Sequence, residues 1–189
     1  LYTQVQNVRV STAADWQEVS RWYAELCAPH IAKTNAEMAA MVEGFRAECG
    51  GDRQALMRRV FRFVSQEVRY MGLTLEEESP GYAPHDVHIT FDNRYGVCRD
   101  KAALLVAMFR IAGIDAYPVL ISVGPKMDED VPLPYFNHAI VAVERETSGD
   151  GGRYMLMDPT NENTKDIFPA YLSDKSYLVC RPEGDELRT

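Results

Sequence analysis

Cys98 stands at the start of a long apolar run, in the segment "YGVCRDKAALLVAMFRIAG" that spans residues 95–113. Apolar residues on nearly every side predict a buried helix over about 98–112, so the cysteine is expected in the first turn. The positive end of the helix dipole and the N–H groups there stabilise a thiolate, the nucleophilic form of cysteine. The alternative is a small buried hydrophobic residue, which is the role of most free cysteines. Cys98 is therefore a candidate nucleophile, but chemistry also requires a base.

His138 and Asp158 are the candidates for that base and for the acid that orients it. They lie in "FNHAIVAVERE" and "RYMLMD", which are typical of two strands, joined by the turn-rich "TSGDGG". An antiparallel hairpin centred near Ser148 places the two residues opposite each other, and a slightly later centre shifts them only by a few residues. Each alone has an ordinary explanation, a satisfied core histidine and an Asp-Pro-Thr turn. Their occurrence together, after a helix that begins with cysteine, favours a reactive site.

The chemistry of such a site is acyl transfer through a thioester. The imidazole takes the thiol proton, the carboxylate fixes the imidazole tautomer, and the thiolate attacks an amide or ester carbonyl. Water as the second substrate gives a protease, peptidase or amidase, whereas an amine gives a cross-linking transglutaminase. Because both reactions use the same three side chains, these residues do not separate the two outcomes.

A second group of polar residues, His85 and His88 in "HDVH" with Asp92 nearby, raises the possibility of a metal site. Histidines three apart outside a clear helix, with no further spaced ligands, are a weak signal for zinc. We therefore predict no metal ion and no cofactor. For His85 we favour a structural role in the "GYAPH" loop, where it would shape one wall of a cleft.

Composition and charge argue against several classes of partner and structure. The chain has 189 residues, 46% of them hydrophobic and 25% charged, which is ordinary for one globular domain. A net charge of −8 without a Lys/Arg cluster argues against nucleic acid as a partner. No apolar stretch has the ~18 residues that a membrane span needs. The four cysteines are scattered without a CxxC pair, a spacing that fits neither a disulfide scaffold nor a zinc knuckle.

The elements that must position the site follow from periodicity. Helical spacing of apolar residues predicts helices within 11–32, where Pro29 should end or bend the helix, and within 34–51, where Thr34 and Glu37 match a capping box. A third helix is expected within 52–73, and then a long loop that includes at most a short strand. After the cysteine helix the period changes to two, and Pro118 would limit the strand "AYPVLIS" to an edge or a bulge. Helices followed by antiparallel strands predict an α+β fold.

The chain resembles the transglutaminase-like superfamily of cysteine enzymes. The segments that carry the resemblance are "YGVCRDKAALLVAMFRIAGIDAYPVLI", "NHAIVAV" and "YMLMDPT", with "VRYMGL" and "GYAPHDV" upstream. The resemblance implies a papain-like core, in which a helix with the nucleophile Cys98 packs on a sheet that carries the base His138 and the acid Asp158. Relatives in the bacterial branch of this superfamily often carry an acidic residue where this chain has Val97. In the superfamily an upstream polar or aromatic side chain often supplies a second oxyanion donor. Tyr70, Asn93 and Tyr95 are the candidates for that donor here.

The resemblance is to a bacterial branch in which this domain follows an N-terminal β-domain in larger, often exported proteins. It implies a tail or linker at 1–12, a catalytic domain at 13–180 and the start of a following segment at 181–189. It also implies a periplasmic or cell-envelope location, a peptide or protein substrate, and contact with flanking domains. Hydrolysis by a cysteine protease or amidase is the favoured activity. The alternatives are an amine-accepting transglutaminase and a catalytically silent binding module.

Overall fold

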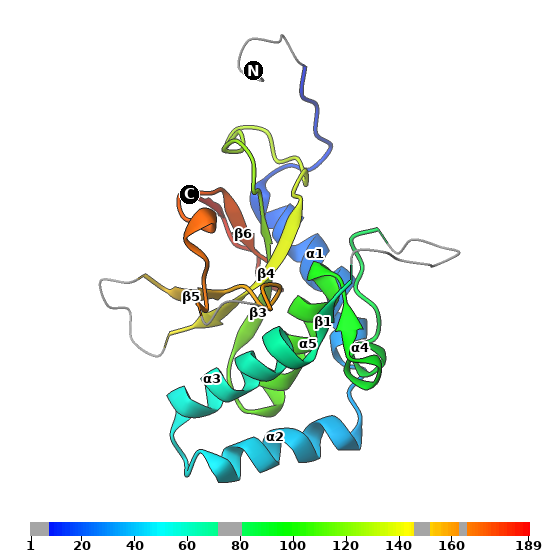
Figure 1. Cartoon of the computed structure of the whole chain (residues 1–189). Coiled ribbons are helices and arrows are strands. Elements are labelled where there is room, and N and C mark those ends of the chain that lie inside the picture. Colours follow the sequence, from blue (N-terminus) through cyan, green and yellow to red (C-terminus); the bar gives the residue numbers. More distant parts are fainter. Residues whose placement is uncertain (1–7, 72–80, 146–151, 163–165) are drawn as a thin grey trace.

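The computed structural model describes residues 8–71, 81–145, 152–162 and 166–189 (Figure 1). Helices occupy the first part of the chain and an antiparallel sheet the second, which confirms the α+β class. The elements are α1 (Trp16–Ile31), α2 (Ala36–Glu48), α3 (Arg53–Arg62), a π-helix (Phe63–Glu67), β1 (Arg69–Tyr70), α4 (Val87–Asn93), β2 (Tyr95–Gly96), α5 (Cys98–Ile111), β3 (Ala116–Ile121), β4 (His138–Glu144), β5 (Tyr154–Met157), a 3₁₀ helix (Ala170–Leu172), β6 (Tyr177–Val179) and β7 (Leu187–Arg188).

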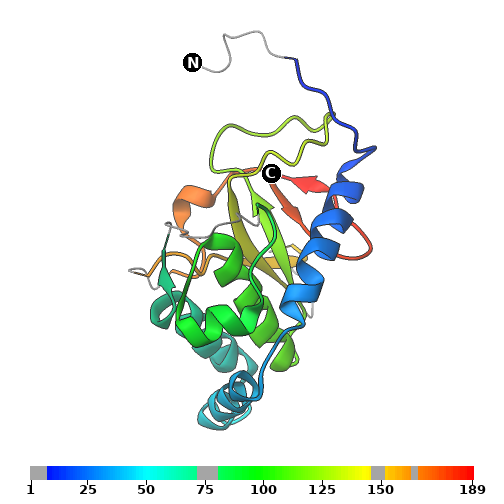
Figure 2. The same cartoon turned by 90° about the vertical axis from the view of Figure 1, so that its right-hand side faces the viewer.

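Helix α5 is the central element of the fold. Every residue from 100 to 109 in it is buried, as the apolar run predicts. Helices α1, α2, α3 and α4 pack around it, and its remaining side lies on β3 and β4 (Figures 1 and 2). Because α5 begins at Cys98, this packing fixes the position of the cysteine from several sides.

The first three helices differ from prediction at their ends. Pro29 lies inside α1, which continues to Ile31, so the proline does not end the helix. Helix α2 is capped by Asn35, whose side chain accepts a hydrogen bond from the Met38 N–H, and not by Thr34. The third predicted helix is shorter than expected, because α3 passes into a π-helix and then into the short strand β1. A change of helical type of this kind is common near functional sites.

The segment before Cys98 is more ordered than the sequence suggests. Helix α4 falls where we predicted only a loop with a short strand, and residues 72–80 of that loop lie outside the described part. Strand β2 pairs in parallel with β1, so that Arg69 faces Tyr95 and Tyr70 faces Gly96. The N–H of Arg69 donates to the Arg94 carbonyl at 2.8 Å. This pairing holds the end of the π-helix segment against the start of α5.

The main sheet has the strand order β5-β4-β3-β6-β7, and all of its pairs are antiparallel. Pro118 lies in β3, in the middle of this sheet, so its assignment to an edge or bulge was wrong. The Pro118 carbonyl accepts a hydrogen bond from the Cys180 N–H at 2.9 Å, just after β6 ends at Val179. In an antiparallel ladder the N–H and C=O of one residue point to the same neighbour. The N–H that proline lacks therefore falls where β6 has already ended.

Both faces of the sheet are buried. One face packs on the helical layer and forms the large core around α5. The other face carries a smaller apolar cluster that includes Ile140, Tyr154 and Leu172, the last of them from the 3₁₀ helix. Residues 166–172, between β5 and β6, therefore pack on the sheet face that the helices leave open (Figure 2). No helix in the described parts of the chain is long and apolar enough to cross a membrane.

Candidate active site

The thiol of Cys98 lies in the first turn of α5, where the sequence places it. The side chain is partly exposed, and the His138 imidazole and the backbone N–H groups of Arg99 and Ala139 lower the pKa of its thiol. Ala139 belongs to β4, so one contact joins the helix to the sheet. Helix N–H groups and a neighbouring imidazole are the two features that stabilise a cysteine thiolate.

Asp100 shapes the turn that presents Cys98. Its buried carboxylate accepts a hydrogen bond from the Val97 N–H at 3.0 Å, which caps the start of α5. The other carboxylate oxygen accepts from the His85 N–H at 2.9 Å and from His85 Nδ1 at 3.0 Å. One acidic side chain thus joins the cysteine turn to the loop before α4.

Gly96 allows the close approach of β2 to α5. A Cβ at this position would lie 2.7 Å from the Asp100 Cβ and 3.2 Å from the Thr90 Cγ2. We therefore expect Gly96→Ala to lower the free energy of unfolding by about 1–3 kcal/mol, the usual cost of overpacking. A Cβ added at Gly44, in α2, would have nothing within 4 Å. Gly44→Ala is the matched control and should stabilise the fold by about 0.5–1 kcal/mol. Urea unfolding of both variants measures the difference, and equal midpoints would contradict this account.

His138 and Asp158 come from neighbouring strands and are hydrogen-bonded to each other. His138 is the first residue of β4, and Asp158 follows directly after β5. Val141 faces Met157, so the hairpin is centred on residue 149 and Ile140, not His138, falls opposite Asp158 when the register is continued. His138 Nε2 lies 3.0 Å from Asp158 Oδ2, a contact between diagonal neighbours. Because Nε2 is engaged with Asp158, Nδ1 is the ring atom left to face the thiol.

The carboxylate of Asp158 is fully buried and held on every side. Oδ1 accepts hydrogen bonds from the Thr160 N–H at 2.9 Å and the Thr160 hydroxyl at 2.7 Å. Oδ2 accepts from His138 and, at 3.4 Å, from the hydroxyl of Tyr171 in the 3₁₀ helix. The turn after β5 therefore fixes the carboxylate in the orientation that the imidazole requires.

The electrostatics of the three side chains are coupled. Burial raises the pKa of the Cys98 thiol, but the hydrogen bond and positive charge of His138 outweigh it, and the net shift is downward. Burial lowers the pKa of His138, but hydrogen bonds and negative charge at Asp158 and Cys98 raise it to about 9. Burial raises the pKa of Asp158, but His138 and Thr160 lower it overall. The arrangement favours a thiolate beside an imidazolium, with the carboxylate ionised.

The three oxyanion candidates differ in placement. Tyr70, in β1, lies beside Gly96, and its pKa is raised by burial and then by the charges of Cys98 and Asp158, which places its ring in the field of the site. Asn93 ends α4 and Tyr95 begins β2, and both are exposed. Tyr70 is also exposed, at 44%, and its surroundings include the charges of Cys98 and Asp158.

The histidines of "HDVH" do not converge. His85 contacts Asp100, whereas His88 Nδ1 lies 3.1 Å from the Lys33 carbonyl, and Asp92 accepts a hydrogen bond from the Asn35 side chain at 3.0 Å. No group of three or more His, Cys, Asp or Glu side chains within the described residues is arranged to hold a metal ion. His85 lies in the loop before α4, and its contact with Asp100 holds it close to the first turn of α5.

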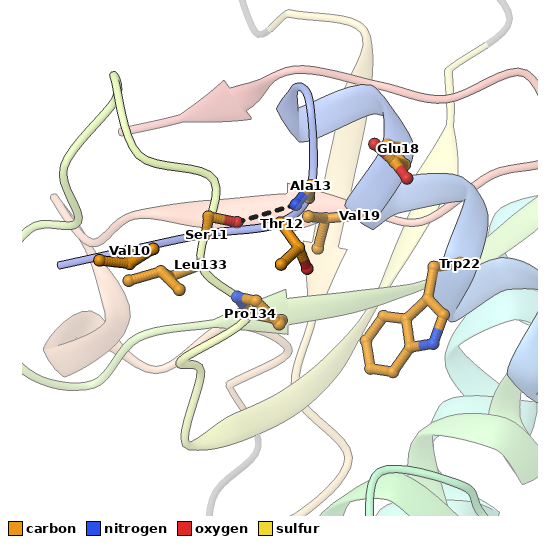
Figure 3. Close-up of a pocket in the computed structure, with 9 residues that line it drawn as sticks. All are labelled: Val10, Ser11, Thr12, Ala13, Glu18, Val19, Trp22, Leu133 and Pro134. Atoms are coloured by element: carbon orange, nitrogen blue, oxygen red, sulfur yellow. Dashed lines mark hydrogen bonds between the residues drawn. The ribbon is translucent and has the colours of Figure 1, made fainter.

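The loop before β4 is anchored to Tyr82, in the loop before α4, and to the N-terminal part of the chain. The hydroxyl of Tyr82 donates to the Phe136 carbonyl at 3.0 Å, and the Ser11 hydroxyl donates to the Pro132 carbonyl at 2.7 Å. A cavity of about 340 Å³ lies in this region (Figure 3). It is lined by Val10, Ser11, Thr12, Ala13, Glu18, Val19, Trp22, Leu133 and Pro134. None of the three candidate catalytic residues lines this cavity.

All four cysteines are free thiols, and their environments differ. Cys27 and Cys180 are buried in the main core. Burial raises the pKa of Cys27 to about 12 and raises that of Cys180 well above its usual range. Cys49 is partly exposed at the end of α2. Among the four, Cys98 is the thiol whose surroundings lower its pKa.

Sequence reasoning missed three side chains near the site. Thr160 was assigned only to a turn, although a threonine two residues after an aspartate is a known way to bond its carboxylate. Tyr171 carries no signal, because it lies in a short 3₁₀ helix far along the chain. Lys101 is hidden inside the apolar run of α5, yet it is fully buried.

Comparison with known families places these features in context. A family model described as the transglutaminase-like superfamily matches residues 39–159, which is more than half of the chain. The matched region includes Cys98, His138 and Asp158. A comparison with curated proteins gives no significant match.

One of the solved structures that match shares the fold, and two others match over about two thirds of this chain. A "putative protease" from Parabacteroides distasonis superposes with a TM-score of 0.61 over 93% of this chain at 14% identity, and the match covers 31% of that protein. A "putative cysteine protease" from Cytophaga hutchinsonii gives a TM-score of 0.44, 20% identity and coverage of 65% and 37% of the two chains. The periplasmic domain of TgpA from Pseudomonas aeruginosa gives a TM-score of 0.46 at 21% identity, and the match covers 66% of this chain and 42% of that one. The chain thus spans about a third of the length of the first of these proteins.

Proposed function

The chain belongs to the transglutaminase-like superfamily, and we propose that it is a cysteine-nucleophile enzyme that cleaves amide bonds with Cys98, His138 and Asp158 as its catalytic triad. The observation that carries the proposal is the hydrogen bond of 3.0 Å between His138 Nε2 and Asp158 Oδ2, with the imidazole near enough to Cys98 to lower the pKa of its thiol. Asp158 is in turn fixed by Thr160. A buried structural cysteine would not need a histidine and a buried carboxylate aligned behind it.

The reaction follows from the protonation states. The Cys98 thiolate attacks the substrate carbonyl, and the oxygen becomes an oxyanion near the Cys98 backbone N–H and the Tyr70 hydroxyl, its proposed donors. The His138 imidazolium gives its proton to the leaving amine, and the C–N bond breaks to leave a thioester on Cys98. His138 then takes a proton from water, whose oxygen attacks the thioester. The C–S bond then breaks, the acid product leaves, and the Cys98 thiolate is restored beside the His138 imidazolium.

The substrate is proposed to be a peptide or protein, and water the second substrate. Support comes from the fold shared with a protein named a putative protease, at an identity that shows the fold alone. The location is proposed to be the periplasm or cell envelope, in line with the periplasmic origin of one structural neighbour. Residues 81–86, before α4, and residues 124–136, before β4, are proposed to form the cleft walls that choose the substrate.

Acylation by p-nitrophenyl acetate tests this function without knowledge of the natural substrate. We expect a burst of about one p-nitrophenolate per folded chain, because this activated ester should acylate Cys98 faster than the thioester is hydrolysed. Mass spectrometry should place the acetyl group on Cys98. The Cys98→Ala variant should lose the burst, whereas Cys49→Ala should keep it.

The second half of the same experiment separates the possible outcomes. Release of acetate in the presence of a primary amine supports hydrolysis, whereas formation of the acetyl amide instead would make the protein a transglutaminase. If Cys98 is acylated no faster than Cys49, the protein is not an enzyme of this type. It would then be a binding module that keeps the fold.

A further inference from the structure

Lys101 is a fully buried lysine one helical turn after Cys98. Its Nζ donates hydrogen bonds to the Ser65 carbonyl at 3.3 Å and to the Val68 carbonyl at 2.5 Å. A buried ammonium is costly unless hydrogen bonds or opposite charges compensate it. Burial lowers the pKa of Lys101 to about 8, while the carboxylates of Glu162 and Asp158 oppose that shift. The chain therefore retains a charge in its core, next to the site.

The two carbonyls that Lys101 holds lie where a helix ends. Ser65 belongs to the π-helix, and Val68 is the extended residue that follows it. Carbonyls at a helix end lack partners within the helix and carry partial negative charge, so an ammonium is well suited to satisfy them. A methionine of similar length would fill the space but leave both carbonyls without this donor. The lysine thus fixes the point at which the chain leaves the helix.

The residues that come next form one side of the site. Val68 leads directly into β1, whose Tyr70 faces Gly96 in β2. Strand β2 ends two residues before Cys98. Residues 65–71 are thus tied to the start of α5 twice, by the Lys101 side chain and by the strand pairing. Together the two attachments set the place of Tyr70 relative to Cys98.

A third attachment joins this segment to the loop that carries Asp158. The Tyr70 N–H donates a hydrogen bond to the Glu162 carboxylate. Glu162 also acts on the charge of Lys101, as does Asp158. The lysine ammonium therefore lies among the three segments that contribute Cys98, Tyr70 and Asp158.

We infer that Lys101 is a positioning residue, whose ammonium holds the Ser65 and Val68 carbonyls so that the Tyr70 hydroxyl is fixed beside the carbonyl that Cys98 attacks. The inference rests on the proposed function, because it assigns Lys101 a part in the same site. Lys101 touches neither the substrate nor the thiol in this account. It acts through Tyr70.

Two reactions of Cys98 separate this role from general stability. Acylation by p-nitrophenyl acetate passes through an oxyanion, whereas alkylation by iodoacetamide does not. We expect Lys101→Met to slow acylation by about 10-fold or more, as loss of an oxyanion donor does. At the plateau of each variant's own pH profile, alkylation should change less than about twofold, because the thiolate itself is intact. Tyr70→Phe should give the same pattern.

The double variant tests whether the effect of Lys101 on acylation depends on Tyr70. If Lys101 acts through Tyr70, Lys101→Met combined with Tyr70→Phe should be no slower than the slower single variant, because coupled sites are not additive. Lys33→Met, at an exposed lysine, is the matched control and should leave both reactions unchanged. If Lys101→Met does not fold, Lys101→Gln keeps one donor, and an intermediate loss of acylation is expected.

Three results would overturn the inference. Parallel loss of acylation and alkylation in the Lys101 variants would mean that the lysine only stabilises the fold. If the double variant loses acylation rate by the product of the two single losses, Lys101 acts without Tyr70. A wild-type protein whose Cys98 alkylates with a lowered pKa but is not acylated would refute the proposed function, and this inference with it.

Discussion

Replacement of His138 by alanine is expected to slow alkylation of Cys98 by iodoacetamide by about 10-fold or more at about pH 6.5, and to change it little above about pH 9. In the wild-type protein the pKa of the Cys98 thiol is lowered and that of His138 is raised to about 9. At a pH above the pKa of the Cys98 thiol and below that of His138, the pair is a thiolate beside an imidazolium. Alkylation should therefore remain fast well below the ordinary titration range of a cysteine.

The sign of the change follows from what remains without the imidazole. Burial raises the pKa of Cys98 and His138 is the main group that lowers it, so in His138→Ala the thiol pKa returns to about 8.5 or above. At about pH 6.5 only about one thiol in a hundred is then ionised, so the variant alkylates more slowly than the wild-type protein, whose thiol pKa is lowered. At high pH the thiol is ionised in both proteins, and the difference disappears.

Two controls belong to this measurement. Cys49, read in the same digest, reports any general change in alkylation. His30→Ala removes an imidazole that is also paired with a carboxylate, Asp86 at 2.8 Å, but lies outside the site, and it should leave the Cys98 profile unchanged. A wild-type Cys98 that alkylates with the profile of Cys49 would rule out the thiolate–imidazolium pair.

Asp158→Asn should lower the rate of Cys98 acylation by p-nitrophenyl acetate by about 10²–10⁴-fold, the range seen when the orienting acid of a triad is replaced. The amide keeps the shape of the side chain but loses the charge that raises the pKa of His138. The imidazole should then lose its proton at lower pH, and it can also adopt the wrong tautomer. In the pH–rate profile of acylation, the descending limb near pH 9 should move to lower pH.

The matched control for this variant is Asp174→Asn. Asp174 is an exposed carboxylate whose pKa is lowered by Lys126, and its left-handed backbone, with φ 57°, accommodates asparagine. We expect that variant to keep the wild-type rate and profile. If Asp158→Asn moves neither the rate nor the descending limb, His138 does not depend on Asp158 for its charge.

Patterns that depend on local periodicity predicted most of the fold. The run that became α5 is apolar on nearly every side, and the strands that became β3 and β4 are short apolar runs rich in β-branched residues. Elements that depend on distant partners were missed. Strands β1 and β2 have two residues each and exist only because they pair with each other, and the π-helix ends where a buried lysine from α5 meets its carbonyls.

The residue types of the candidate site were readable because they stand at the boundaries of regular elements. Cys98 begins a helix, His138 begins a strand and Asp158 follows one. The hairpin centre was predicted to within about one residue, since the turn-rich segment limits where the chain can reverse. The support around the site was not readable, because Tyr171 and Lys101 reach it through tertiary packing that leaves no local pattern.

The burial of Cys27 and Cys180 gives this chain a built-in reporter of its own unfolding. Each is only 1% exposed, and burial raises the pKa of both thiols, so neither can react while the core is closed. A single exposure to an alkylating reagent therefore labels Cys98 at the rate set by its local chemistry. It labels the two core thiols at the rate set by global opening. The ratio of the labels, read by peptide mass, measures reactivity and kinetic stability in one sample of the native protein.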